Sequence, residues 1–470
     1  MKRFILINII LFCFNELKAQ DERLTLSESE LIQIVNAYHP FALQTNISIQ
    51  QAETDVLNAR GAFDPLIQSS FSKKELGGSM YYNYQQTELK IPTWYGIEFN
   101  AGIENVSGLN TDPQKTNLAS SYAGVSFSVL KNILIDKRRA TLQQAKIVVE
   151  QSQAERNAIL NDLVYDAVTQ YWEWVRYYRE WLIVKEVVKT NEVRLNYTKQ
   201  VVTVGERPAI DTTEALTQLF YYQSLQNELE MQMQNALIQL STYTWKPSSE
   251  PYTLPFSLTP STSSFATNEM DFMIPASEEL IRDAMSSHPE LEIYKSKFKF
   301  LDIEKKLKFQ ELLPDVKIKY NQLGKNYSVP ETIAQPLLQN NYQYALSFAV
   351  PLRLSQGRAG YKQAKLKITS TELQLDLKQR MIENKIREQL NTLSMLRNQL
   401  NIQENLYQSQ AILLKGEEIR FQNGESSLFL INSREQKNIE TFQKLNATIA
   451  KYYKQKASLK WATGNLYIVK

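Results

Sequence analysis

The feature that most constrains this chain is a run of 69 residues, Asp136 to Val204, that contains no glycine and no proline. Such a run is typical of helix, and at about 1.5 Å per residue it would be roughly 100 Å long, more than an ordinary compact domain encloses. Apolar and aromatic side chains recur at steps of three and four, which predicts a coiled-coil-like seam: Leu142, Ala145, Val149, Leu160, Leu163, Ala167, Tyr171, Trp174, Tyr178 and Trp181.

The chain is duplicated. A second run without glycine or proline, Tyr361 to Lys415, repeats the design, and turn glycines Gly205 and Gly424 follow the two runs before further helical segments. His-Pro at 288–289 stands 249 residues after His-Pro at 39–40, and the same offset separates the starts of the strand regions. The offset falls to 221 at the last strand of each half. The first half therefore carries about 28 extra residues between its strands.

Strand-like alternation follows the first helical segments. We predict strands at about 63–73, 94–105 and 121–130 in the first half, and at 316–327 and 344–350 in the second. In the stretch 122–129, small or polar residues alternate with apolar ones. This pattern suits a barrel wall between water and lipid, and it fits a soluble sheet nearly as well.

Residues 1–19 are predicted to be a secretory signal peptide, because Lys2 and Arg3 precede an apolar stretch too short to span a bilayer. The only cysteine, Cys13, lies inside it, so no disulfide is expected. Without this segment the chain has 50 basic and 49 acidic residues, which gives no electrostatic case for a nucleic-acid partner. No other stretch is apolar enough for a membrane helix, so a membrane-spanning form would have to use strands.

The predicted organisation is a first repeat at residues 20–245, an inter-repeat linker at 246–276 and a second repeat at 277–470. The linker prediction comes from five prolines among many serines and threonines, which favour an extended segment outside the core. Each repeat is predicted to have the element order helix, strand, strand, helix, turn, helix. The fold class is thus mainly α with β, built on two long antiparallel helical hairpins.

This order of elements resembles the TolC-like outer-membrane efflux proteins over essentially all of the chain after the signal peptide. The segments 420–427 (RFQNGESS) and 459–466 (LKWATGNL) also resemble that family. The resemblance implies a homotrimer in which each chain gives four strands to a 12-stranded β-barrel in outer-membrane lipid, above a helical tunnel in the periplasm. The first half offers three strand-like stretches within 62–130 where the family pattern has two, so which of them enter the barrel stays open.

The function implied is a passive exit duct of a tripartite efflux or type I secretion system. A periplasmic adaptor would join it to an inner-membrane pump. The alternative is a structural periplasmic coiled-coil protein without transport activity. The sequence shows no motif of an enzyme, a cofactor site or a metal site. His39 and His288 could be metal ligands, but each precedes a proline at equivalent helix restarts, which favours a backbone-shaping role.

The resemblance places a periplasmic gate and an adaptor-docking surface at the helix-hairpin tips. Asp211 and Glu214 follow Gly205 by six and nine residues, and three-fold symmetry would make each of them a ring of three carboxylates that favours cations. Alternatively, Asp211 at the start of a helix would stabilise the helix dipole. In the family the acidic ring comes from the second tip, where this chain has Leu430 and Ser433. We expect Leu428 and Leu430 to narrow the closed mouth.

Adaptor docking is expected at Gly205 and Gly424, because small residues let another helical hairpin approach the backbone closely. Ser426 and Ser427 would extend that surface. Both glycines would serve equally as helix C-caps, which is compatible with docking.

Overall fold

The computed structural model describes residues 25–108, 118–261, 276–338 and 340–468. The predicted signal peptide and Cys13 lie outside these ranges. The chain forms two compact units: the first combines the described parts of 1–35, 167–273 and 397–454, and the second those of 36–166, 274–396 and 455–470. Each unit draws on both halves of the sequence, as expected of an intertwined duplication. Over the described residues, no helix has the length and hydropathy needed to cross a membrane.

The short helices repeat with equal lengths. Helices α1 (Glu28–Tyr38) and α5 (Ser277–Ser287) have 11 residues each, while α2 (Pro40–Gly61) and α6 (Pro289–Gln310) have 22 each. His39 and His288 are N-caps of α2 and α6. Each Nδ1 accepts a hydrogen bond of 3.2 Å from the backbone N–H two residues on. The predicted backbone-shaping role of the two histidines is therefore confirmed, with proline at the first helical position.

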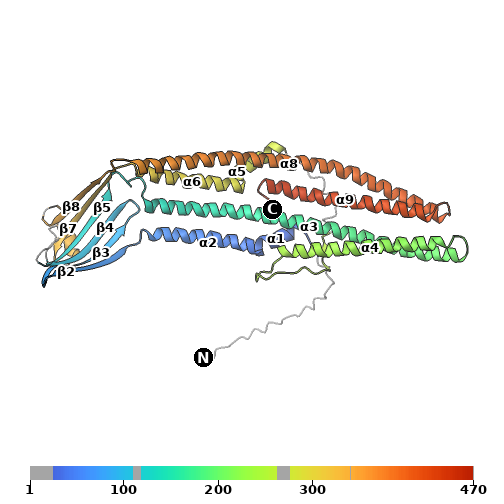
Figure 1. Ribbon diagram of the computed structural model, residues 1–470, viewed down its shortest axis with the longest axis horizontal. Coiled ribbons are helices and arrows are strands. Elements are labelled where there is room, and N and C mark those ends of the chain that lie inside the picture. The colour runs from blue at the N-terminus through green and yellow to red at the C-terminus, as the bar shows by residue number, and fades with distance from the viewer. Residues whose placement is uncertain (1–24, 109–117, 262–275, 339, 469–470) are drawn as a thin grey trace, which may run out of the picture. The chain divides into compact units, whose positions relative to one another are not determined.

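Two helices are much longer than the others, with 67 and 68 residues (Figure 1). Helix α3 (Lys137–Thr203) matches the predicted run within one residue at each end, and α8 (Ser355–Gln422) extends beyond the predicted run on both sides. The extension includes glycines 357, 360 and 416, which cost a helix only about 1 kcal/mol each relative to alanine. Helices α4 (Ile210–Leu240) and α9 (Leu428–Ala462) follow the turns at Gly205 and Gly424.

A six-stranded antiparallel sheet lies in the second unit (Figure 1). Its spatial order is β2 (Leu66–Leu76), β3 (Ser79–Pro92), β4 (Ile97–Ser107), β5 (Leu118–Ser128), β7 (Asp315–Lys325) and β8 (Tyr342–Ala349). Among the described residues this sheet therefore has six strands, where the alternation in the sequence predicted five and the resemblance implied four barrel strands per chain. Strand β3 was missed because its polar residues, including Gln85, Gln86 and Glu88, hide the apolar alternation that marks a strand in sequence.

The segment predicted as an extended linker is partly packed. Its residues Thr259–Pro260 form β6, which pairs in parallel with β1 (Thr25–Leu26) in the first unit. Leu254 and Leu258 are buried there. Tertiary contacts thus bring the described part of residues 246–276 into the core despite its prolines. The two remaining short elements are η1 (Ser241–Tyr243) and α7 (Val329–Ala334).

Aromatic side chains of α3 are buried in the first unit. Trp172 stacks on Tyr453 of α9 with ring centroids 4.0 Å apart, and the Tyr171 hydroxyl donates a 3.0 Å hydrogen bond to the Leu26 carbonyl. Trp174 is also fully buried. These rings therefore stabilise the packing of α3 against its neighbours.

Candidate functional site: a two-faced sheet and the hairpin tips

One face of the sheet is apolar across all six strands. The register between strands places these exposed or half-buried side chains on one side: Ile67, Phe71, Leu89, Ile91, Ile97, Phe99, Ile103, Val125, Phe127, Ile318, Tyr344, Leu346 and Phe348. Phe71 and Leu346, on the first and last strands, are 68% and 67% exposed. An apolar surface that spans a whole sheet is typical of contact with lipid or with another protein.

The opposite face is polar and more buried. Its side chains include Gln68, Ser70, Gln86, Glu88, Glu98, Asn100, Glu104, Ser120, Tyr122, Asn321, Gln343 and Ser347. Hydrogen bonds cross-link the strands along this face. Ser120 of β5 donates to Glu104 of the neighbouring β4 at 3.0 Å, whereas Gln86 of β3 donates to the Tyr122 hydroxyl of β5 across β4 at 2.6 Å, and Asn100 of β4 donates to Asn321 of β7 across β5 at 2.9 Å. This face is suited to line water.

Helix α7 covers a small part of the apolar face. Thr332 of α7 and Ser121 of β5 share a hydrogen bond of 2.8 Å between their hydroxyls, and the Leu338 N–H donates to the Tyr320 hydroxyl at 3.1 Å. Ile333 and Leu337 are exposed and line a pocket together with apolar-face residues of the sheet such as Phe99. The surface presented over the sheet therefore stays apolar where α7 lies on it.

The hairpin tips lie together in the first unit. Gly205 and Gly424 have φ values of 80° and 78°, which non-glycine residues rarely adopt, and a Cβ at either would meet no atom within 4 Å. Both glycines therefore end their helices as C-caps, and their backbones are open to solvent.

Arg207 ties the two tips to each other. Its guanidinium lies 4.1 Å from the centre of the Phe421 ring and donates a 3.3 Å hydrogen bond to the Ser426 carbonyl. The same group forms a 3.4 Å ion pair with Asp211, and both side chains are 17% exposed. Sequence reasoning did not single out Arg207, although a cation four residues before Asp211 at a helix start is a recognisable ion-pair spacing.

The four predicted gate residues differ in position. Glu214 accepts a 3.3 Å hydrogen bond from Asn432 of α9, so both predicted carboxylates contact other side chains. Leu430 is 41% exposed, whereas Leu428 is 2% exposed and belongs to the core cluster that includes Ile431 and Phe421. The side chain of Leu428 therefore supports the tip from inside and is not placed to line an opening.

The two predicted docking serines have local partners. The Ser426 hydroxyl donates a hydrogen bond to Glu417 of α8. The Ser427 hydroxyl accepts a 3.3 Å hydrogen bond from the Leu430 N–H, which makes Ser427 a cap of α9. These bonds fix the shape of the second tip.

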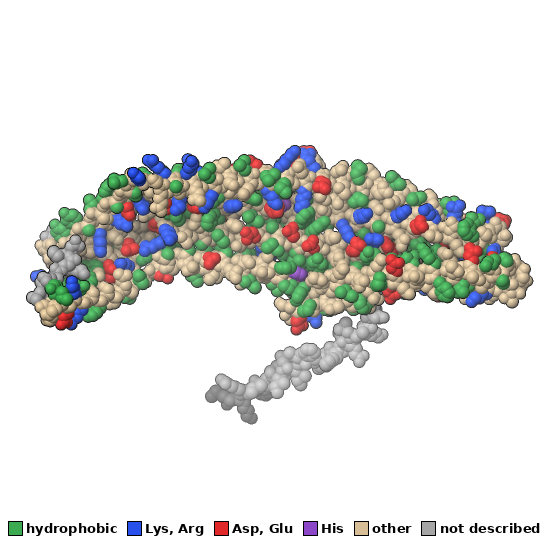
Figure 2. Space-filling model, viewed as in Figure 1, with side chains coloured by type: hydrophobic (Ala, Val, Ile, Leu, Met, Phe, Trp, Pro, Cys, Tyr) green, Lys and Arg blue, Asp and Glu red, His purple; other side chains and the backbone are tan. Residues whose placement is uncertain are grey.

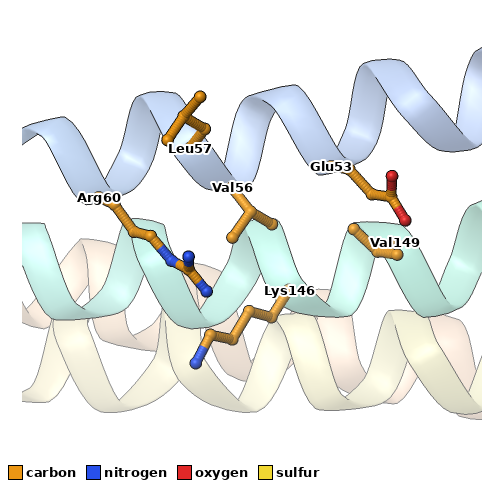
Figure 3. Close-up of a pocket in the computed structure, with 6 residues that line it drawn as sticks. All are labelled: Glu53, Val56, Leu57, Arg60, Lys146 and Val149. Atoms are coloured by element: carbon orange, nitrogen blue, oxygen red, sulfur yellow. The ribbon is translucent and has the colours of Figure 1, made fainter. Parts of the chain in front are cut away.

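An open groove of ≈ 360 Å³ lies between α2 and α3 in the second unit (Figure 3). Glu53, Val56, Leu57 and Arg60 line it from α2, and Lys146 and Val149 from α3. Val56 and Arg60 point towards α3, whereas Leu57 points away and is 67% exposed (Figure 3). No cluster of three or more metal-binding side chains occurs among the described residues. The groove is thus an uncovered helix face.

Comparison with known proteins supplies the fold class. No protein-family model and no curated protein matches the sequence. Solved structures do match, at probability 1.00: the CmeC outer membrane channel of Campylobacter jejuni has 14% identity and a TM-score of 0.62, with 93% of this chain and 86% of that chain covered. The outer membrane protein VceC of Vibrio cholerae has 11% identity and a TM-score of 0.63, covering 94% and 97%.

A third match is the open state of the MtrE outer membrane channel of Neisseria gonorrhoeae, with 13% identity, a TM-score of 0.62, and 94% and 89% of the two chains covered. The chain therefore has the TolC-like fold of outer-membrane channels over nearly all of its length. This confirms the resemblance found in the sequence, at the level of fold.

Proposed function

We propose that this protein is a channel subunit of the bacterial outer membrane, and that it serves as the passive exit duct of a tripartite efflux or secretion system. It would act as a homotrimer whose strands form a barrel in outer-membrane lipid and whose helices form a tunnel in the periplasm. The observation that carries the proposal is the sheet with one continuous apolar face and one hydrogen-bonded polar face. The TolC-like fold supports it.

The sheet edges and the helices support assembly of several copies. Strands β2 and β8 are the two edges of the sheet, and an open edge cannot face lipid because its backbone groups would stay unpaired. Helix α8 also carries an exposed apolar stripe at coiled-coil spacing, Leu366, Leu373, Leu377 and Met381. Neighbouring copies would cover this stripe as well as the groove of Figure 3.

The exported compounds would pass through without chemistry, and energy would come from an inner-membrane pump through a periplasmic adaptor. Basic and acidic side chains are mixed on the surface seen in Figure 2, where hydrophobic side chains lie between them. This mixture, with the formal net charge of +3 for the whole chain, offers no basis for nucleic-acid binding.

We place the gate at the tips. Leu430 would narrow the mouth, with Leu428 behind it in the core, while Asp211 and Glu214 would supply selectivity for cations. The Arg207–Asp211 ion pair would hold the closed arrangement, because Arg207 also binds the second tip through Ser426 and Phe421. Adaptor docking would use the open backbones at Gly205 and Gly424, together with Ser426 and Ser427.

Reconstitution in a planar bilayer tests the channel. Purified protein should be a trimer that needs detergent for extraction from outer membranes, and it should give small, long-lived conductance steps. Arg207→Ala should raise the open probability, Leu430→Ser should raise conductance, and Asp211→Asn should reduce cation preference. Extraction without detergent and no conductance from folded protein would instead support the structural coiled-coil alternative.

A further inference from the structure

The extra length of the first half is a complete strand hairpin. Strand β2 maps onto β7 at the offset of 249, with 11 residues in each, and the last residue of β5 maps onto the last residue of β8 at the offset of 221. Strands β3 and β4 have no counterpart in the second half, where β7 and β8 pair directly. The extra length thus corresponds to β3, β4 and their connection, at about residues 79–107, between the two strands that both halves share.

The inserted strands are part of the wall. Strand β3 pairs with β2 and β4 pairs with β5 over ten or more residues each. On the apolar face, Leu89, Ile91 and Phe99 continue the surface from β5 to β2. On the polar face, Gln86 and Glu104 bond to Tyr122 and Ser120 of β5. Both faces of the sheet thus continue without interruption through the inserted hairpin.

The duplication also predicts how the sheet edges meet. Strand β5 is the last strand of the first repeat and pairs with β7, the first strand of the second repeat, with Ser126 opposite Lys319 and Val125 opposite Tyr320. Applying the two offsets to these pairs places Ser347 of β8 opposite Ser70 of β2, and Leu346 opposite Phe71. Both pairs join like faces: Ser347 and Ser70 are polar-face residues, while Leu346 and Phe71 are on the apolar face.

We propose that each copy contributes six strands to the barrel, and that β8 of one copy pairs with β2 of the next in this register. The inference rests on the proposed membrane channel. Because six is even, β8 and β2 run in opposite directions and an all-antiparallel ring closes without a mismatch. Three copies of six strands give an 18-stranded barrel, about one and a half times as wide as one of 12 strands.

Cysteine cross-linking in the full-length protein tests the register. In a Cys13→Ser background the double variant Ser70→Cys/Ser347→Cys should lose its monomer band on non-reducing gels of outer membranes, with reductant restoring it. Directly opposed strand residues lie within disulfide range. The neighbouring pair Ser72→Cys/Ala345→Cys should behave in the same way, and each single variant should stay unlinked.

The contrasting pair is Glu104→Cys/Ser347→Cys, because Glu104 of β4 lies in the same row of the sheet as Ser70. A disulfide in this variant, with none in the Ser70 and Ser72 double variants, would mean that β8 of one copy pairs with β4 of the next. That result would overturn the inference. Trimers with normal conductance but no β2–β8 link would also overturn it while leaving the channel proposal standing. Absence of any oligomer would reject both.

Discussion

Arg194 of α3 and Glu435 of α9 face each other as a buried two-pronged ion pair. The closest nitrogen and oxygen are 2.9 Å apart, the second contact is 3.1 Å, and Asn191 donates a further 2.9 Å hydrogen bond to the same carboxylate. Burial raises the pKa of the nearby Tyr222 hydroxyl above its usual value, and the charge of Glu435 raises it further. This site binds the long helix of the first half to the last helix of the second half, within the first unit.

Breaking this pair should destabilise the first unit strongly. Glu435→Ala would leave the Arg194 guanidinium buried without its counter-charge, which costs about 3–5 kcal/mol. The measurement is the free energy of unfolding in denaturant. The control is Glu186→Ala, because Glu186 pairs with Lys189 on the exposed surface of α3; its loss should cost about 1 kcal/mol or less. Equal costs for the two variants would contradict the prediction.

Asn161 should hold the C-terminal segment against α3 in the second unit. Its side chain donates to the Trp461 carbonyl and accepts from the Leu466 N–H, both at 2.9 Å, and it is buried. Asn161→Leu should leave the Leu466 N–H unpaired, at about 1–3 kcal/mol, whereas the Trp461 carbonyl keeps its 2.9 Å bond from the Gly464 N–H. Hydrogen exchange at the Leu466 amide should then accelerate. Asp162→Asn keeps an acceptor for the Trp461 indole N–H and should leave that amide protected.

The cap at His288 should make stability depend on pH. Burial lowers the pKa of His288 below 6.5; nearby Glu290 opposes this shift, and Lys385 and Lys378 add to it. Because Nδ1 accepts the Glu290 N–H, the folded state favours the neutral ring. As pH falls, the histidine is protonated in the unfolded chain before it is protonated in the folded one. The contribution of the neutral His288 cap to the free energy of unfolding is therefore complete above pH 6.5, and it is lost between pH 6.5 and the lower pKa of the folded state.

The measurement is the difference in unfolding free energy between the native protein and His288→Asn, from pH 8 to pH 4. Asparagine keeps a capping oxygen and does not titrate. The native protein should lose stability relative to this variant as pH falls, by about 1.4 kcal/mol for each unit of pKa difference. A constant difference across this range would show that the histidine does not titrate differently in the folded state.

Two glycines with the same backbone conformation should differ in their tolerance of alanine. Gly464 and Gly424 both have a φ of 78°, so either substitution should cost about 1–2 kcal/mol in the left-handed conformation. At Gly464 the new Cβ would also lie 2.5 Å from Cδ of Pro289, whereas at Gly424 it meets nothing within 4 Å. Thermal unfolding should therefore rank Gly464→Ala as clearly the more destabilising, and the opposite ranking would contradict this explanation.

Some of the candidate site was visible in the sequence, because turn chemistry is local. Gly205 and Gly424 were predicted as turn residues from their place after long helical runs. Asp211 and Glu214 were proposed from the resemblance to the TolC-like family and from their distance along the chain from Gly205. Arg207 was missed, because its role depends on Phe421 and Ser426, more than two hundred residues away. Leu428 and Leu430 could not be told apart either, since both are apolar and only packing buries one of them.

The sequence by itself determined the long helices, the duplication and the two histidine caps. Helix needs only an unbroken run of suitable residues and local caps, and a fixed offset between repeats is a property of the chain. Only the tertiary structure decided the number of strands and their order. A strand such as β3 becomes stable when distant segments supply its hydrogen-bond partners on both sides, and its polar residues fit because that face of the sheet is polar. The chain fixes its helices through neighbouring residues, whereas its sheet depends on pairing between both halves of the duplication.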